Sequence, residues 1–207
     1  KSQEELEMLA AKKVKHLYLG IESGLDDVLK FMKKDHDLGQ AYQAIDRLHE
    51  AGLIYDAHIM TGVAGKGRGM ENAEALAQFL NRTNPAHVVN FSMFLHKEVP
   101  LYEDIRQGTF VPADELETIR EEYHLIERIA PEKAGANILY DGFHDFIHVR
   151  VRGHLPGDKE KMLAKLSGII QEYEGKEPVY SFVQGECPDL EYCDDGKAVW
   201  DMDRKTS

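Results

Sequence analysis

The sequence predicts an α/β fold built on parallel strands, and two observations support this class. Three apolar runs that are too short for helices occur at residues 17–22, 54–62 and 87–95. A helical pattern follows each run, at a spacing that suits the crossover connections between parallel strands. Because such crossovers are right-handed, the carboxyl ends of all three strands should lie along one rim of the sheet.

The first predicted strand ends in a polar turn that is the main candidate for a ligand site. Residues 14–34 read VKHLYLGIESGLDDVLKFMKK, so Glu22 and Ser23 stand between the strand and an amphipathic helix. Ligand sites of α/β folds lie at the carboxyl ends of parallel strands. The alternative is that both residues only cap the helix that follows them.

Two further helices are predicted around this first unit. A helix at residues 2–13 precedes the first strand, with Ser2 as its N-cap and apolar residues recurring on one face. Another helix covers residues 39–51. Gly52 follows it at the position where glycine commonly ends a helix.

The second strand ends in a glycine-rich turn, TGVAGKG at residues 61–67, before a helix near residues 71–80. Glycines in such a turn allow the backbone to approach a phosphate or an aromatic ring. The spacing matches neither the phosphate-binding loop of nucleotide hydrolases nor the dinucleotide motif, so the pattern alone does not identify a ligand.

The third strand completes the rim. Residues 84–85, Asn-Pro, separate it from the preceding helix. A short helix is expected after residues 96–102, and a long amphipathic helix at 113–129. Asn90 or His96 should then lie at the same rim as the polar ends of the first two strands.

Two segments resemble one known family. GIESG followed by LDDVLKFMKK resembles the fourth strand and helix of radical S-adenosylmethionine (radical SAM) enzymes, most closely a group of iron–sulfur oxidoreductases with the pattern G-[LIV]-E-S-G-x-D-x-V-L-K-x-M. GHLPGDKEKML at residues 153–163 resembles the G-x-L-P-x-D-K-E-K-L-L segment of the same group. The resemblance covers about residues 2–130 and continues weakly to residue 173. It implies half of an incomplete (β/α) barrel, with residues 1–131 as the C-terminal half of the core.

The same resemblance implies a set of cofactor-binding residues. In this family, polar groups at this strand end hold the ribose and amino-acid parts of S-adenosylmethionine, which assigns that role to Glu22 and Ser23. Lys34 stands where a basic residue often holds the cofactor's carboxylate. Gly62 and Gly65 keep the glycine positions of the family's G-x-x-G turn beside the adenine, although the residues around them differ from the usual ones.

The resemblance also implies a [4Fe–4S] cluster held by a C-x-x-x-C-x-x-C loop. This chain has no such loop, and its two cysteines, Cys187 and Cys193, lie near its end. Since it also begins with Lys1 rather than Met, we expect it to be part of a longer enzyme that binds S-adenosylmethionine and the cluster. We expect the fragment alone to bind neither and to be inactive. The alternative is a cofactor-free α/β module that binds a partner, and cluster cysteines upstream in the parent would exclude it.

The pattern changes after Pro131. Residues 132–174 predict a small α+β appendage, with a strand at 148–152 and a helix from about residue 158 to 170. Residues 175–207 read as a polar tail.

Several residues of metal-binding types have a simpler interpretation. Three histidines lie close together in the appendage, but they match no standard ligand spacing, so structural or solvent-facing roles are expected. These are His144, His148 and His154. For Cys187 and Cys193 we expect a reduced, unpaired state, and for His58 a place in the packed core.

Composition restricts the partners. The 207 residues carry a formal charge of −12, which argues against a nucleic-acid surface. No apolar run is long enough to cross a bilayer, and we expect a cytoplasmic protein that binds a small-molecule cofactor. An incomplete barrel exposes a sheet edge, so self-association is also expected.

Overall fold

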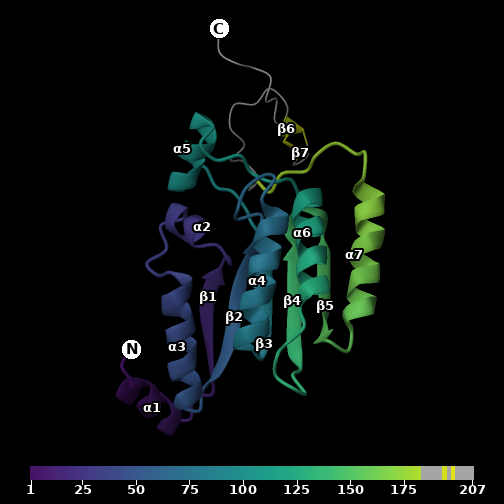
Figure 1. The fold of residues 1–207 in the computed structure, drawn as a ribbon. Helices are drawn as coiled ribbons and strands as arrows, with labels where there is room; N and C mark the ends of the chain where they lie inside the picture. Colours follow the sequence, from purple (N-terminus) through teal and green to yellow (C-terminus); the bar gives the residue numbers. More distant parts are fainter. Residues whose placement is uncertain (183–192, 195–196, 199–207) are drawn as a thin grey trace.

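The computed structural model describes residues 1–182, 193–194 and 197–198, and a five-stranded sheet organises the first of these ranges (Figure 1). Its strands lie in chain order: β1 (His16–Glu22), β2 (Ile54–Thr61), β3 (His87–Ser92), β4 (Ile138–His144) and β5 (Val149–Leu155). Strands β1 to β4 are parallel, and β5 is antiparallel to β4. The predicted parallel arrangement of the first three strands is confirmed.

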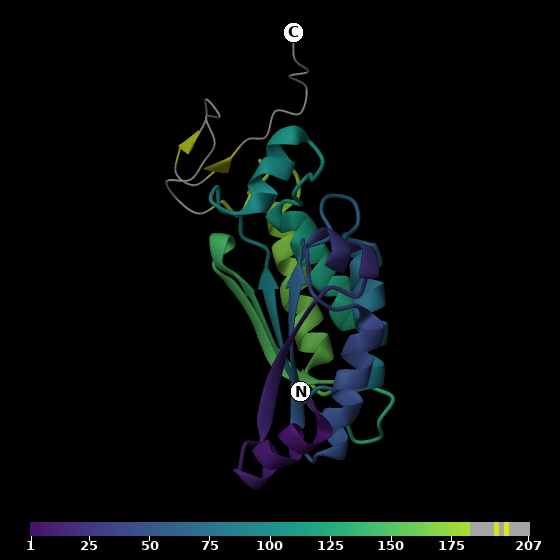
Figure 2. The same cartoon turned by 90° about the vertical axis from the view of Figure 1, so that its left-hand side faces the viewer.

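Helices cover one face of this sheet (Figure 2). The helices are α1 (Gln3–Ala11), α2 (Asp26–Phe31), α3 (Leu38–Glu50), α4 (Gly69–Thr83), α5 (Pro100–Gln107), α6 (Glu115–Arg128) and α7 (Lys159–Tyr173). Helices α3, α4, α6 and α7 lie along the same side, whereas the opposite face carries no helix in the described part of the chain. A curved, mostly parallel sheet with helices outside is the partial (β/α) barrel predicted from the sequence. We call the helix-free side the open face.

Local sequence signals explain where the helices begin. Ser2 forms a capping box with Glu5, since its hydroxyl accepts the Glu5 N–H and the Glu5 carboxylate accepts the Ser2 N–H. Asp37 and Gln40 form the same box at the start of α3. Gly52 follows α3 with a φ of +73°, as expected for a glycine that ends a helix.

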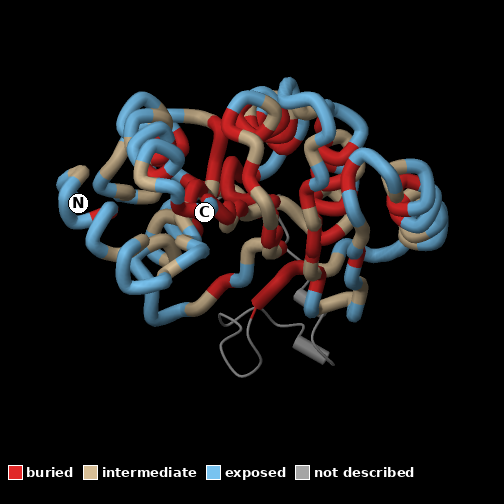
Figure 3. Tube along the Cα trace, turned by 90° about the horizontal axis from the view of Figure 1, so that it is seen from below, coloured by how far each residue is buried: buried red, intermediate tan, exposed pale blue. Residues whose placement is uncertain are grey.

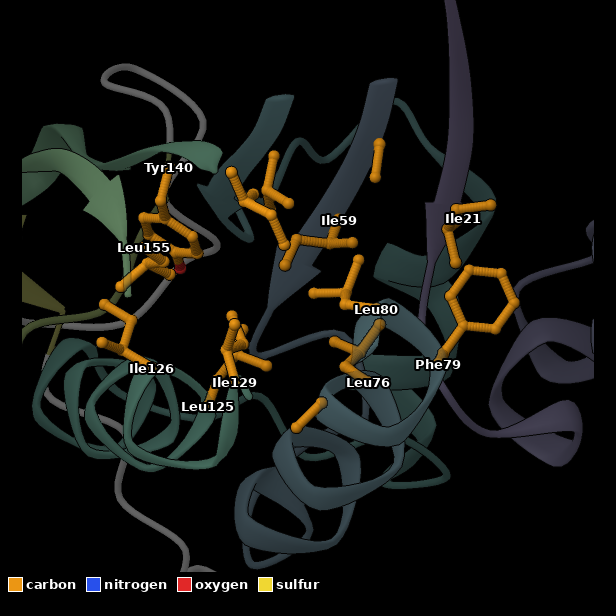
Figure 4. Packing of buried hydrophobic residues seen from close by; sticks show 14 of the residues in the cluster. Ile21, Ile59, Leu76, Phe79, Leu80, Leu125, Ile126, Ile129, Tyr140 and Leu155 are labelled. Carbon is orange, nitrogen blue, oxygen red and sulfur yellow. The ribbon is translucent and has the colours of Figure 1, made fainter. Parts of the chain in front are cut away.

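The main core lies between the sheet and its helices (Figure 3). Figure 4 shows Ile59 and Tyr140 from the sheet near Leu80 of α4 and Leu125 of α6. These side chains are essentially inaccessible to water, and burial of each contributes about 1.5–3 kcal/mol. The same interlayer space also contains polar groups, which support the rim described below.

Residues 132–174 differ from the predicted appendage in one respect. They contain the predicted strand and helix, as β5 and α7, but they also contain β4, which pairs with β3 and so continues the main sheet. Strand β4 has Asp141, Gly142 and His144 in its sequence, and such residues are uncommon in a buried strand. Their partners come from elsewhere in the chain, so the strand could not be predicted from its own sequence.

The edges of the sheet are β1 and β5. Self-association through an exposed edge stays a prediction. Within the described residues, the helices are too short or too polar to cross a membrane.

Candidate functional site

A row of aromatic rings crosses the open face. The ring centre of Tyr18 lies 5.0 Å from that of His58, which lies 6.0 Å from that of Phe91. Phe91 stacks on Phe143 at 5.6 Å, and the Arg150 guanidinium lies 4.7 Å from the Phe143 ring centre. The five side chains come from β1 to β5 in order. His58 is therefore partly exposed in this row, and its predicted place in the core is wrong.

Glu22 ends β1 in a strained backbone conformation. Its φ is +61°, in the left-handed region that non-glycine residues rarely adopt, and the pairing of β1 with β2 is irregular between Gly20 and Glu22. Such a conformation costs on the order of 1–3 kcal/mol and is typical of ligand sites. Glycine would avoid this cost.

The Glu22 carboxylate lies above Gly20 and binds Lys34. A Cβ atom added at Gly20 would lie 2.7 Å from Glu22 Oε1, so the missing side chain makes room for the carboxylate. Lys34 Nζ donates to Oε1 at 3.1 Å, and the two side chains are 31% and 23% exposed for Lys34 and Glu22. Two predicted site residues thus form a partly exposed ion pair, and a groove beside β1 borders Lys34.

Ser23, by contrast, is fully buried. Its hydroxyl donates to Asn72 Oδ1 at 2.6 Å and accepts the Leu25 N–H at 3.1 Å. The N-cap of α2 is Leu25, which has no side-chain cap, so Ser23 does not cap that helix in the predicted manner. This geometry favours a supporting role for Ser23 over direct contact with a ligand.

Gly62 and Gly65 are also buried, and contacts within the protein explain both. Their φ angles are +83° and +80°, which glycine adopts without strain. A Cβ at Gly62 would lie 2.8 Å from Thr118, and one at Gly65 would lie 3.0 Å from the Val111 carbonyl oxygen. Gly65 borders a second depression, between α2 and Phe110, rather than the groove beside Lys34.

Glu121 of α6 links two of the predicted residues. Its Oε2 accepts the Gly62 N–H at 2.8 Å, and its Oε1 accepts from Asn72 Nδ2 at 2.7 Å. Asn72 in turn accepts from Ser23 and from the Gly24 N–H at 3.1 Å. Burial raises the pKa of Glu121 to about 7, although the hydrogen bonds from Asn72 and Gly62 oppose this rise.

A second buried cluster centres on His144. Its Nδ1 lies 3.0 Å from Glu115 Oε2 and its Nε2 lies 3.0 Å from Glu122 Oε2. Burial acts to lower the pKa of His144, but the two carboxylates outweigh it and raise the pKa to about 10. Glu122 also accepts from Tyr140 and Asn90, at 3.0 and 3.1 Å. His144 thus has a structural role as a cation between two carboxylates. Asn90 lies on the covered side of the sheet, where its amide donates to Glu122.

The remaining candidates do not form a site with these residues. His148 and His154 are exposed, whereas His144 is buried. Among the described residues, no group of His, Cys, Asp and Glu side chains could hold a metal ion. His96 lies 5.6 Å from Phe94 in a ring contact. Cys187 and the side chain of Cys193 lie outside the described residues, so the prediction about their state stays untested.

Sequence reasoning missed Asn72, Glu115, Glu121 and Glu122. Part of the signal was available: Glu115, Thr118 and Glu122 recur at the same spacing as Leu125 and Ile129, so acidic residues occupy core-facing positions of α6. Acidic residues at core positions indicate a buried polar network. Nothing in the sequence indicated which strand residues would be their partners.

The chain has recognisable relatives. Residues 2–80 match the sequence profile of the Radical SAM superfamily. A tRNA uridine(34) acetyltransferase from Methanocaldococcus infernus is 26% identical over 119 residues, which are 57% of this chain and 22% of that protein. The structure of the M. infernus Elp3 with an N-terminal deletion of residues 1–46 superimposes with a TM-score of 0.58 at 19% identity. The superposition covers 83% of this chain and 39% of the Elp3 chain.

The profile match confirms the family resemblance over residues 2–80, and the structural match confirms the fold. The chain spans about a fifth of the curated relative it matches, and the structural likeness, at 19% identity, supports the fold alone. The two relatives are an acetyltransferase and an Elp3 rather than the oxidoreductases suggested by the motifs. Residues 2–80 thus carry the sequence pattern of the Radical SAM superfamily, within a partial barrel like that of Elp3.

Proposed function

We propose that this chain forms one side of the S-adenosylmethionine site of a longer radical SAM enzyme. The observation that carries the proposal is the Glu22–Lys34 pair, which lies partly exposed at the carboxyl end of β1. The amino-acid part of the cofactor carries one ammonium and one carboxylate. A Glu–Lys pair offers the complementary charges, and a carboxylate also accepts hydrogen bonds from ribose hydroxyls.

Each residue has a definite task in this proposal. Glu22 binds the ammonium or the ribose, and Lys34 binds the carboxylate. Ser23, Gly62 and Gly65 shape the turns that carry this pair, because their polar groups or close packing are used within the protein. The bound cofactor, when reduced at a cluster, supplies radical chemistry.

The described residues do not fit a [4Fe–4S] cluster. Thiolates hold such clusters, and the described positions with side chains contain no cysteine. The proposal places the ligands of the cluster in another part of the longer protein, and three closely spaced cysteines in that part would support it.

A second candidate concerns the reaction. The match over 119 residues to a tRNA uridine(34) acetyltransferase favours a tRNA-modifying acetyltransferase over an oxidoreductase as the parent enzyme. The charge of −12 then implies that another part of the protein contacts the RNA. Nucleoside analysis of tRNA after incubation with the parent enzyme, acetyl-coenzyme A and S-adenosylmethionine tests this: acetylated uridine supports it, and unmodified tRNA contradicts it.

The cofactor proposal is tested by Glu22→Gln in the full-length protein with its cluster rebuilt. Losing a charge-assisted hydrogen bond costs about 1.5–3 kcal/mol, so calorimetric titration should show S-adenosylmethionine binding about ten- to a hundredfold weaker. Glu50→Gln is the matched control, because Glu50 is exposed at the end of α3, lies outside the groove beside β1, and its loss changes the charge equally. Unchanged affinity in Glu22→Gln, with a lower Tm, would overturn the assignment.

A further inference from the structure

We infer that Glu121 and Asn72 are positioning residues that join the turn after β1 to the turn after β2. The inference rests on the proposed function, since these two turns carry Glu22 and Gly62. It adds two buried residues to which the proposed function gives no role, Asn72 of α4 and Glu121 of α6. The consequence is that neither turn can move without the other.

The connection is a continuous chain of hydrogen bonds. It runs from the Gly62 N–H to Glu121, from Glu121 to the Asn72 amide, and from that amide to Ser23 and Gly24. The orientation of Asn72 follows from chemistry, because the Gly24 N–H can only donate and must face the amide oxygen. The amide NH₂ group therefore faces Glu121, which must accept.

Close packing leaves the two turns little room to separate from the helices. A Cβ at Gly24 would lie 2.4 Å from the Leu76 backbone nitrogen in α4. One at Gly69 would lie 3.0 Å from Glu121 Oε2, so α4 and α6 touch directly at this carboxylate. Both turns thus sit against the same helix pair at the point where Glu121 joins them.

A carboxylate is the side chain that this position requires. Two donors, a backbone N–H and an amide N–H, point at its two oxygens. Glutamine has one acceptor oxygen and would present its NH₂ group to one of these donors. A buried carboxylate without a cation is costly to keep, so a position that needed only packing would be better filled by an apolar side chain.

The most direct test changes one end of this chain of hydrogen bonds and measures amide hydrogen exchange at the other end. Ser23→Ala removes the hydroxyl in the β1 turn and leaves Glu121 in place. Amide hydrogen exchange in the full-length protein, without ligand, should then accelerate about fivefold or more at residues 62–65, as expected for the loss of about one hydrogen bond. Glu121→Gln should accelerate exchange at residues 23–25 and 62–65 together.

Glu127→Gln is the matched control, since Glu127 is an exposed acid on the same helix. It should leave both turns unchanged. Acceleration confined to the turn that carries the mutation would overturn the inference. So would equal acceleration throughout the sheet, which indicates general destabilisation. If Glu121→Gln does not fold, Ser23→Ala alone decides.

The ligand experiment separates this inference from the proposed function. Glu121→Gln should weaken S-adenosylmethionine binding about tenfold with little change at β4 and β5. If wild type fails to bind the cofactor while the two turns still exchange together, the proposed function fails and the positioning role stands. If Glu22→Gln weakens binding but the turns exchange independently, the positioning role fails and the site stands.

Discussion

The covered face of the sheet and the rim beside β1 use charged side chains in opposite ways. On the covered face, Glu115, Glu121 and Glu122 are almost completely buried, and each accepts hydrogen bonds from neighbouring elements. At the rim beside β1, Glu22 and Lys34 are partly exposed and bind each other. Buried charges depend on their partners for stability, whereas exposed pairs contribute little to it. Substitutions on the covered face should therefore alter stability, and those at the Glu22–Lys34 pair should alter binding.

The largest effect is expected at His144. His144→Ala removes the cation between Glu115 and Glu122 and leaves two buried carboxylates without it, which should lower the free energy of unfolding by about 3–5 kcal/mol. Denaturant titration measures this. His154→Ala, at an exposed position of β5, should stay within about 0.5 kcal/mol of wild type. A small loss for His144→Ala would show that the cluster is not charged.

The next effect is the pH dependence due to Glu121. Its pKa rises from 4.5 to about 7 on folding, so the protonated form favours the folded state. This stabilisation is full below about pH 4.5 and is lost as the pH rises through 7. Relative to Glu121→Gln, wild type should thus lose about 3 kcal/mol between pH 4.5 and pH 8. Parallel curves for the two proteins would contradict the burial of this carboxyl.

A smaller effect separates strain from function at Glu22. Glu22→Gly removes the cost of a positive φ, so stability should stay unchanged or rise by up to about 1 kcal/mol, while cofactor affinity falls. Lys33→Gly is a matched control, because Lys33 is exposed with a φ of +56°. Lys33→Gly should give the same stability change and retain affinity. A marked loss of stability in Glu22→Gly would indicate a structural role for the carboxylate.

A similar contrast, between local and long-range partners, explains what the sequence could predict. Strands β1 to β3 and the helices around them follow from local patterns, because apolar runs, caps and glycine stops act over a few residues. Glu22 and Lys34 followed from a motif confined to one strand and one helix. Ser23 was placed at the correct turn, but its burial depends on Asn72, which is 49 positions away.

Strand β4 shows why the rest was not predictable. Asp141 and His144 interrupt its apolar pattern, and they are stable there only because Arg150 of β5 and the acids of α6 supply partners. Gly142 is also required by a distant residue, since a Cβ there would collide with Glu122. These residue choices are consequences of tertiary packing, and a local reading of the sequence cannot recover them.

If the rim beside β1 binds S-adenosylmethionine, a crystal structure of the full-length protein with S-adenosylhomocysteine should show the ligand there. That molecule keeps the ribose, ammonium and carboxylate groups that the proposed contacts require. We expect the Glu22 carboxylate within hydrogen-bond distance of the ribose or ammonium, with Lys34 Nζ at the ligand's carboxylate. A ligand bound elsewhere, with the Glu22–Lys34 pair intact, would contradict it.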